Sequence, residues 1–212
     1  MGSTTWVVCL MKAVYMNIDE IEVSSYMKNK IYDFATECAD TNYNHYQKRE
    51  NTKFETVVNM IYWGKLGEFA VYKYLKNEGY ELKKPCLKIL SSRQKSFDSD
   101  LYVKDEGSDY YVHVKTQPQK SFKFCGQPSW LLQYSGKGHG HQDKLFKHLH
   151  PNDMMALTVV NEDETVSLKG IFKTQDLWDY KLLELPKNPW LQKTKRALYF
   201  NNFPKDIEYW NL

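Results

Sequence analysis

The stretch FDSDLYVKDEGSDYYVHVKTQ, residues 97–117, constrains the fold more than any other part of the chain. Two strand-like runs, Ser99–Lys104 and Tyr110–Thr116, flank a turn that is rich in Asp and Gly. Apolar runs closed by such a turn are typical of a β-hairpin. We therefore expect two paired antiparallel strands here.

The alternation of side chains along the second strand separates two kinds of residue. Successive side chains of a strand point to opposite faces, so the apolar set faces the core. This set is Tyr110, Val112 and Val114. His113 and Lys115 then share the other face, and a suitable register would bring Asp100 close to them across the hairpin. On pattern alone, these polar residues are equally well explained as the exposed face of an ordinary strand.

Helical periodicity marks the region before the hairpin. The segment FETVVNMIYWGKLGEFAVYKYLKNEGY, residues 54–80, has apolar residues at helical spacing, and Gly79 supplies a stop. A second helix is predicted over Ile21–Asn42, with Ser24 or Ser25 as its cap. Residues 81–90 suggest an irregular strand.

The second half of the chain alternates helix and strand signals. We expect a short helix near residues 142–149, followed by the strands MMALTVV, residues 154–160, and VSLKGIF, residues 166–172. Strands on both sides of a helix indicate a mixed sheet and an α/β fold. The division we expect is a helical N-terminal extension over residues 1–50 and an α/β core with a C-terminal cap over residues 51–212.

Glu68 lies inside the predicted helix over residues 54–80. Gly64, Gly67 and Ala70 flank it, and such small residues allow a helix to approach a sheet closely. The carboxyl group of Glu68 would then lie at the edge of the sheet. From this residue alone, the simpler interpretation is a solvent-facing acid paired with Lys65 or Tyr72.

Composition limits the classes of function without choosing among them. The chain has 212 residues, 42% of them hydrophobic, which is enough for one sizeable core. Its net charge of +3 is too small to indicate a polyanionic partner, so any such case depends on local clustering. Four widely spaced cysteines and no secretory or membrane-spanning segment favour a soluble protein of the reducing cytoplasm.

The motifs GKLGEFAVYKYL, FDSDLYV and YYVHVKTQ, in this order, resemble the PD-(D/E)XK nuclease superfamily. The likeness covers about residues 54–173, with support from MMALTVV and VSLKGIF, and leaves the first fifty residues and the tail outside. It implies a restriction endonuclease-like mixed sheet flanked by helices. It also implies hydrolysis of DNA with Mg²⁺ or Mn²⁺ as the cofactor.

The resemblance assigns roles to four residues. Asp100 would bind the metal, Lys115 would orient the attacking water and balance charge on the phosphate, and Glu68 would add contacts from its helix. His113 departs from the pattern, because this position usually holds Glu, Asp or Gln. Imidazole suits Mg²⁺ poorly, so the site is weakened, prefers Mn²⁺ or recruits Asp98.

Basic residues bracket these positions and are the expected DNA contacts. They are Arg93, Lys95, Lys120, Lys123 and Lys137. Interleaved aromatic residues, namely Phe122, Phe124, Trp130 and Tyr134, suit base stacking or groove packing. The histidines of GHGHQDKLFKHLH match no known zinc spacing and are better explained by contact with phosphate or solvent.

Three functions follow, in order of preference. The first is a metal-dependent DNA endonuclease, often a homodimer when both strands are cut. The second is a catalytically impaired protein of the same fold that binds DNA or a protein partner. The third is an interaction module that uses the aromatic tail and binds no nucleic acid.

Overall fold

The computed structural model describes residues 18–50, 53–89, 99–105, 108–134, 143–146, 150 and 152–204. The longer helices and the strands are β1 (Ile18–Ile21), α1 (Ser25–Glu50), α2 (Phe54–Asn77), β2 (Glu81–Leu82), β3 (Leu101–Asp105), β4 (Ser108–Pro118), β5 (Ser129–Gln133), β6 (Asp153–Val160), β7 (Val166–Lys173) and β8 (Lys195–Tyr199). The short helical turns are η1 (Gln119–Ser121), α3 (Phe122–Cys125), η2 (Lys144–Phe146), α4 (Asp176–Asp179), η3 (Pro189–Leu191) and η4 (Phe200–Asn202).

The main sheet has six strands in the order β1-β7-β6-β4-β3-β2. Its central pair, β4 and β6, is parallel, and its other pairs are antiparallel. This mixed sheet confirms the predicted α/β class. β5 and β8 form a separate antiparallel pair.

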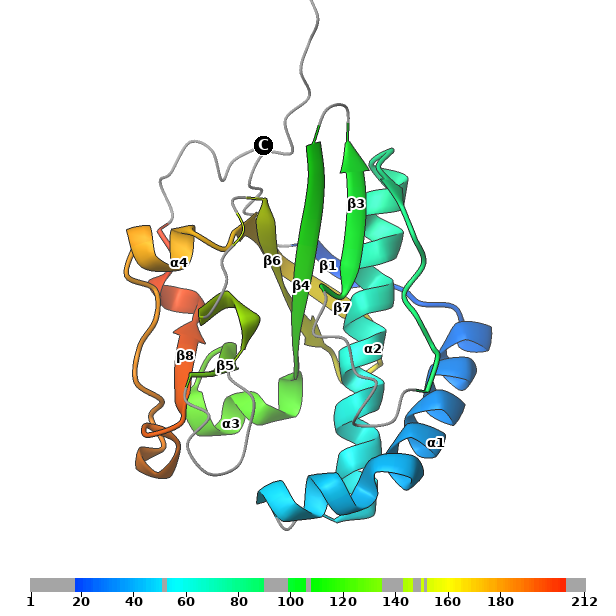
Figure 1. The fold of residues 1–212 in the computed structure, drawn as a ribbon, viewed down its shortest axis with the longest axis horizontal. Helices are drawn as coiled ribbons and strands as arrows, with labels where there is room; N and C mark the ends of the chain where they lie inside the picture. Colours follow the sequence, from blue (N-terminus) through cyan, green and yellow to red (C-terminus); the bar gives the residue numbers. More distant parts are fainter. Residues whose placement is uncertain are drawn as a thin grey trace, which may run out of the picture.

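Two hydrophobic clusters cover the two faces of the main sheet. The residues of β4 predicted to face the core, including Val112, pack with α1 and α2 in the first cluster. The second cluster joins the opposite face of β6, including Leu157, to Trp130 of β5 and Leu198 of β8. The result is three layers, with the helices on one side of the sheet and the β5–β8 pair on the other (Figure 1).

Helix α2 and the β3–β4 hairpin confirm two of the sequence predictions. The helix ends at Asn77, and Gly79 follows in the left-handed region with φ of +93°. β3 and β4 pair with Leu101 opposite Val112 and Asp105 opposite Ser108. The strands predicted at residues 154–160 and 166–172 are β6 and β7.

Two other helix predictions are met only in part. Of the helix predicted over residues 142–149, the structure describes residues 143–146, which include the 3₁₀ turn Lys144–Phe146, and the remaining positions lie outside the described residues. The helix predicted from Ile21 begins at Ser25, since residues 18–21 form β1 and pair with β7. Ser24 serves as its cap, with its Oγ accepting a 3.4 Å hydrogen bond from the amide of Met27.

The approach of α2 to the sheet is closest at Gly67. A Cβ on this glycine would lie 2.0 Å from Oγ1 of Thr116 in β4 and 2.7 Å from Oγ1 of Thr158 in β6. These two hydroxyl groups are hydrogen-bonded to each other at 2.9 Å. Gly64, one turn earlier, has no neighbour within 4 Å of the same position. Gly67 therefore brings the middle of α2 into direct contact with β4.

Candidate active site

The end of β3 places Asp100 beside β4. Strand β3 begins at Leu101, so β4 runs beyond its partner after Val112. Asp100 lies just before β3, and its Oδ2 accepts a 2.8 Å hydrogen bond from the amide of Val114. The carboxylate thus takes the place of a strand carbonyl at the level of His113 and Lys115, and it is itself exposed.

Glu68 is buried against the same part of the sheet. Its position after Gly67 leaves only 8% of the residue exposed, and its Oε2 accepts a 2.7 Å hydrogen bond from Nζ of Lys65. Pairing with Lys65 was expected, but the expected exposure to solvent is wrong. The close helix–sheet contact at Gly67 is the physical reason.

Glu68 and Asp100 also interact electrostatically. Burial is the largest cause and the negative charge of Asp100 the second, and together they raise the pKa of Glu68 to about 8 against the opposing effect of Lys65. The charge of Asp100 is thus close enough to Glu68 to disfavour the ionised form of Glu68. The structure therefore brings Glu68 of α2 and Asp100 of the hairpin together.

Lys115 extends from the face of β4 that is turned away from α2, toward β5. Its Nζ donates a 2.9 Å hydrogen bond to Oδ1 of Asp143. The other oxygen of Asp143 accepts from the amide of Gln133 at 2.6 Å, which ties this ion pair to β5. The sequence analysis did not identify Asp143 as the partner of Lys115. Asp143 could have been considered, because it is the first acidic residue after Asp109.

His113 lies on the same face of β4 as Lys115 and has a different acidic neighbour. Its Nε2 is 3.7 Å from Oδ1 of Asp153, at the start of β6, and both side chains are largely buried. The second oxygen of Asp153 accepts from the amide of His150 at 2.9 Å. The described contacts of His113 are thus with β6 rather than with Asp100.

The donor set of this region suits a hard divalent cation. Within the described ranges, no three His, Cys, Asp or Glu side chains form a ready metal cluster. Glu68 and Asp100 nevertheless provide two carboxyl groups, and a bound cation would favour the ionised form of Glu68 that burial and the charge of Asp100 disfavour. Carboxylate oxygens completed by water are the usual ligands of Mg²⁺, so the residues present fit such an ion.

The expected DNA contacts divide into three groups. Lys123 is exposed, while Nζ of Lys120 lies 4.2 Å from the ring centre of Trp63. Three of the expected DNA contacts and the alternative ligand Asp98 lie outside the described residues; the three are Arg93, Lys95 and Lys137.

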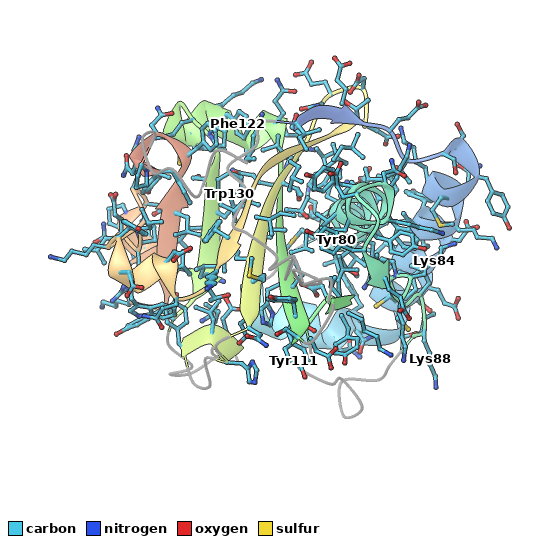
Figure 2. All side chains as sticks on the ribbon, turned by 90° about the horizontal axis from the view of Figure 1, so that it is seen from above. Tyr80, Lys84, Lys88, Tyr111, Phe122 and Trp130 are labelled. Atoms are coloured by element: carbon cyan, nitrogen blue, oxygen red, sulfur yellow. The ribbon has the colours of Figure 1, made fainter. Side chains whose placement is uncertain are left out.

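Trp130 requires a correction, because it is buried and cannot stack on a base. Its Nε1 donates a 2.9 Å hydrogen bond to the carbonyl of Thr158 in β6. The side chain packs in the second cluster, between β5 and the main sheet (Figure 2). By contrast, Phe124 is 90% exposed.

Searches against protein-family models, curated proteins and solved structures find no match for this chain. Among the described residues, no helix combines the length and the apolar composition that crossing a membrane requires. The resemblance to the PD-(D/E)XK nucleases therefore stays a prediction from the sequence motifs.

Proposed function

We propose that this protein is a divalent-metal-dependent endonuclease of DNA with a restriction endonuclease-like fold. The observation that carries the proposal is the pairing of buried Glu68 with Asp100 beside the strand that supplies Lys115. A polar pair held this way costs stability, and such costs concentrate at functional sites. The motif order and the mixed sheet support the same assignment.

Asp100 and Glu68 would hold Mg²⁺ or Mn²⁺, with His113 as the third candidate ligand from the motif pattern. When bound, the ion would neutralise charge on the phosphate and lower the pKa of a water molecule. Asp100 is suited to this role because its Oδ2 is anchored to the amide of Val114, which fixes the carboxylate before substrate arrives. Such fixed groups cost no reorganisation during reaction.

Lys115 would stabilise the negative charge that develops on the scissile phosphate. The ammonium group is held by Asp143, whose second oxygen is bonded to β5. Asp143 therefore orients Lys115 until a phosphate oxygen competes for the hydrogen bond of its ammonium group. We assign Asp143 a positioning role and Lys115 the contact with substrate.

The alternative is a catalytically impaired protein of the same fold that binds DNA or a protein partner. One observation favours it, since both motif residues on the outer face of β4 already have acidic partners. Lys115 contacts Asp143 and His113 lies near Asp153. If these pairs persist in the presence of DNA, Lys115 cannot reach a phosphate.

The proposal also includes a cellular compartment and an oligomeric state for the protein. Cys38, Cys86 and Cys125 are free thiols in the described part of the chain, which accords with a reducing compartment such as the cytoplasm. Cleavage of both strands of a duplex calls for two active sites, so we include a homodimer in the proposal.

Plasmid cleavage in Mg²⁺ and in Mn²⁺ tests the function directly. We expect Lys115→Ala to abolish cleavage while DNA binding and folding are retained, because it removes charge stabilisation in the transition state. Asp100→Asn should lose both cleavage and calorimetric Mn²⁺ binding. Lys104→Ala is the matched control, since Lys104 is an exposed lysine of the same hairpin.

The outcomes separate the two candidate functions. If the wild type cleaves plasmid and Lys115→Ala cleaves it at the same rate, the role assigned to Lys115 is excluded. DNA binding without cleavage by the wild type in either metal would favour the impaired protein. Unchanged Mn²⁺ affinity in Asp100→Asn would move the metal site elsewhere, with Asp98 as the next candidate.

A further inference from the structure

Two long segments of the chain contain no acidic residue. Residues 110–142 and 185–205 include none of the 26 Asp and Glu residues, although they carry Lys and Arg throughout. The near-balanced charge of the whole chain hides this asymmetry. Such a separation of charge produces a positive surface wherever the two segments meet.

The fold brings these two segments together. Each contributes one strand to the β5–β8 pair, with Leu131 opposite Ala197. A second link joins the turns beside the strands, because Nζ of Lys187 donates a 2.8 Å hydrogen bond to the carbonyl of Cys125 at the end of α3. We call this unit, residues 119–134 and 185–203, the basic lobe.

The basic lobe presents two unusually exposed aromatic side chains. Phe124 of α3 and Trp190 of η3 are each 90% exposed. The hydrogen bond between Lys187 and Cys125 links the segments that carry them, since Cys125 directly follows Phe124 and Lys187 lies three residues before Trp190. Single exposed apolar residues are common, but two large aromatic rings on neighbouring turns among lysines are a typical surface for stacking.

Both rings are carried by ordered turns. The side chain of Asn188 caps η3 by accepting a 3.1 Å hydrogen bond from the amide of Trp190. The amide of Gly126, in the left-handed region with φ of +71°, donates a 2.7 Å bond to the carbonyl of Phe122 and closes α3. The rings are therefore presented with little loss of backbone entropy on binding.

The basic lobe adjoins the candidate active site. Residues 119–125 follow β4 directly through η1 and α3, and the pair of Lys115 and Asp143 connects β4 to Gln133 of β5. A polynucleotide with a phosphate at Lys115 would continue across the lysines and rings of the lobe.

We propose that the basic lobe binds unpaired DNA, with Phe124 and Trp190 stacking on bases and the surrounding lysines contacting phosphates. Stacking requires a base face that a duplex keeps covered, so the rings select single strands over duplex. The choice of DNA rests on the proposed nuclease function, whereas the stacking surface itself does not.

Fluorescence anisotropy in EDTA tests the inference without requiring cleavage. The probes are a labelled oligothymidylate of about 20 nucleotides, somewhat longer than the site of one small binding domain, and a hairpin duplex of equal phosphate number. We expect tighter binding of the single strand by the wild type. Phe124→Ala and Trp190→Ala should each weaken single-strand binding by at least about fivefold and leave duplex binding nearly unchanged.

Tyr26→Ala is the matched control for these substitutions. Tyr26 on α1 is also an exposed aromatic residue with a lysine over its ring, at 4.6 Å, but it lies on the helical side of the molecule. This variant should bind as the wild type does. All three side chains are exposed, so their loss leaves folding intact.

Several results would overturn the proposal. These are equal wild-type affinity for both probes, unchanged single-strand affinity in the two lobe variants, and equal losses for duplex and single strand. Failure here leaves the nuclease proposal standing if plasmid is still cleaved. Conversely, selective single-strand binding by a wild type that cleaves neither plasmid nor the single strand would support the lobe and favour the impaired protein over the nuclease.

Discussion

Replacing Glu68 by glutamine should make the protein more stable at alkaline pH. In the unfolded chain this carboxyl group has a pKa of 4.5, whereas burial and the charge of Asp100 raise the pKa to about 8 in the folded protein. Between these values the folded state binds more protons than the unfolded state. The free energy of unfolding therefore falls as the pH rises through this interval, and the contribution of protonated Glu68 is lost above the folded pKa.

The size of the effect follows from the two pKa values. Each pKa unit corresponds to about 1.4 kcal/mol, so the interval from 4.5 to about 8 represents up to roughly 5 kcal/mol. A typical domain has a total stability of about 5–15 kcal/mol, so the loss is readily measured. The amide side chain introduced by Glu68→Gln cannot ionise, and its oxygen can still accept the hydrogen bond from Lys65. The variant should lack this part of the pH dependence.

Urea unfolding followed by tryptophan fluorescence, in EDTA and between about pH 5 and pH 9, measures the difference. Glu55→Gln is the matched control, since Glu55 lies exposed in the first turn of α2 and should show the pH profile of the wild type. Added Mn²⁺ at the alkaline end should restore stability to the wild type more than to Glu68→Gln, because the cation binds the folded protein alone. Parallel pH profiles for the wild type and Glu68→Gln would refute the reasoning.

Three further substitutions test the neighbouring geometry. Gly67→Ala places a methyl group 2.0 Å from Oγ1 of Thr116, so we expect a loss of about 1–3 kcal/mol in urea unfolding. Gly64→Ala, which has open space, should gain about 0.5–1 kcal/mol, and equal effects would contradict the close contact. We expect His113→Glu to shift the ratio of cleavage rates from Mn²⁺ toward Mg²⁺, and an unchanged ratio would assign His113 to its pair with Asp153 alone.

Local features of the sequence were sufficient to predict the hairpin and α2. The alternation along residues 110–116 defines which side chains of β4 face the core, and the register places Asp100 next to that strand. The small residue at 67 predicted the close approach of α2 to the sheet. Each of these features depends on residues that are close together in the sequence, within one or two elements. A local sequence pattern is therefore enough to predict them.

Long-range partners were not predictable in the same way. Asp143 is 28 residues from Lys115, and Asp153 is 40 residues from His113. Strand β5 pairs with a segment more than 60 residues away, and its run SWLLQ gives no sign of which partner it takes. The absence of acids in both β5 and β8 was readable in the sequence, but it acquires a meaning only when the fold joins the two segments.

The unequal lengths of β3 and β4 explain how β4 can both bind Asp100 through its backbone and supply Lys115. β4 continues to Pro118 along β6, while β3 begins opposite Val112, so one edge of β4 has no strand partner from β3 beyond this point. The amide of Val114 is satisfied there by the side chain of Asp100 instead of a carbonyl.

The carboxylate of Asp100 therefore has a structural role and an electrostatic role. Asp100→Asn keeps an oxygen that can accept from the amide of Val114 and removes only the charge, whereas Asp100→Ala would leave that amide without its side-chain acceptor. A loss of metal binding in the Asn variant, with folding preserved, thus reports on charge alone. For this reason the Asn substitution, rather than the Ala substitution, decides whether the carboxylates of this site hold a cation.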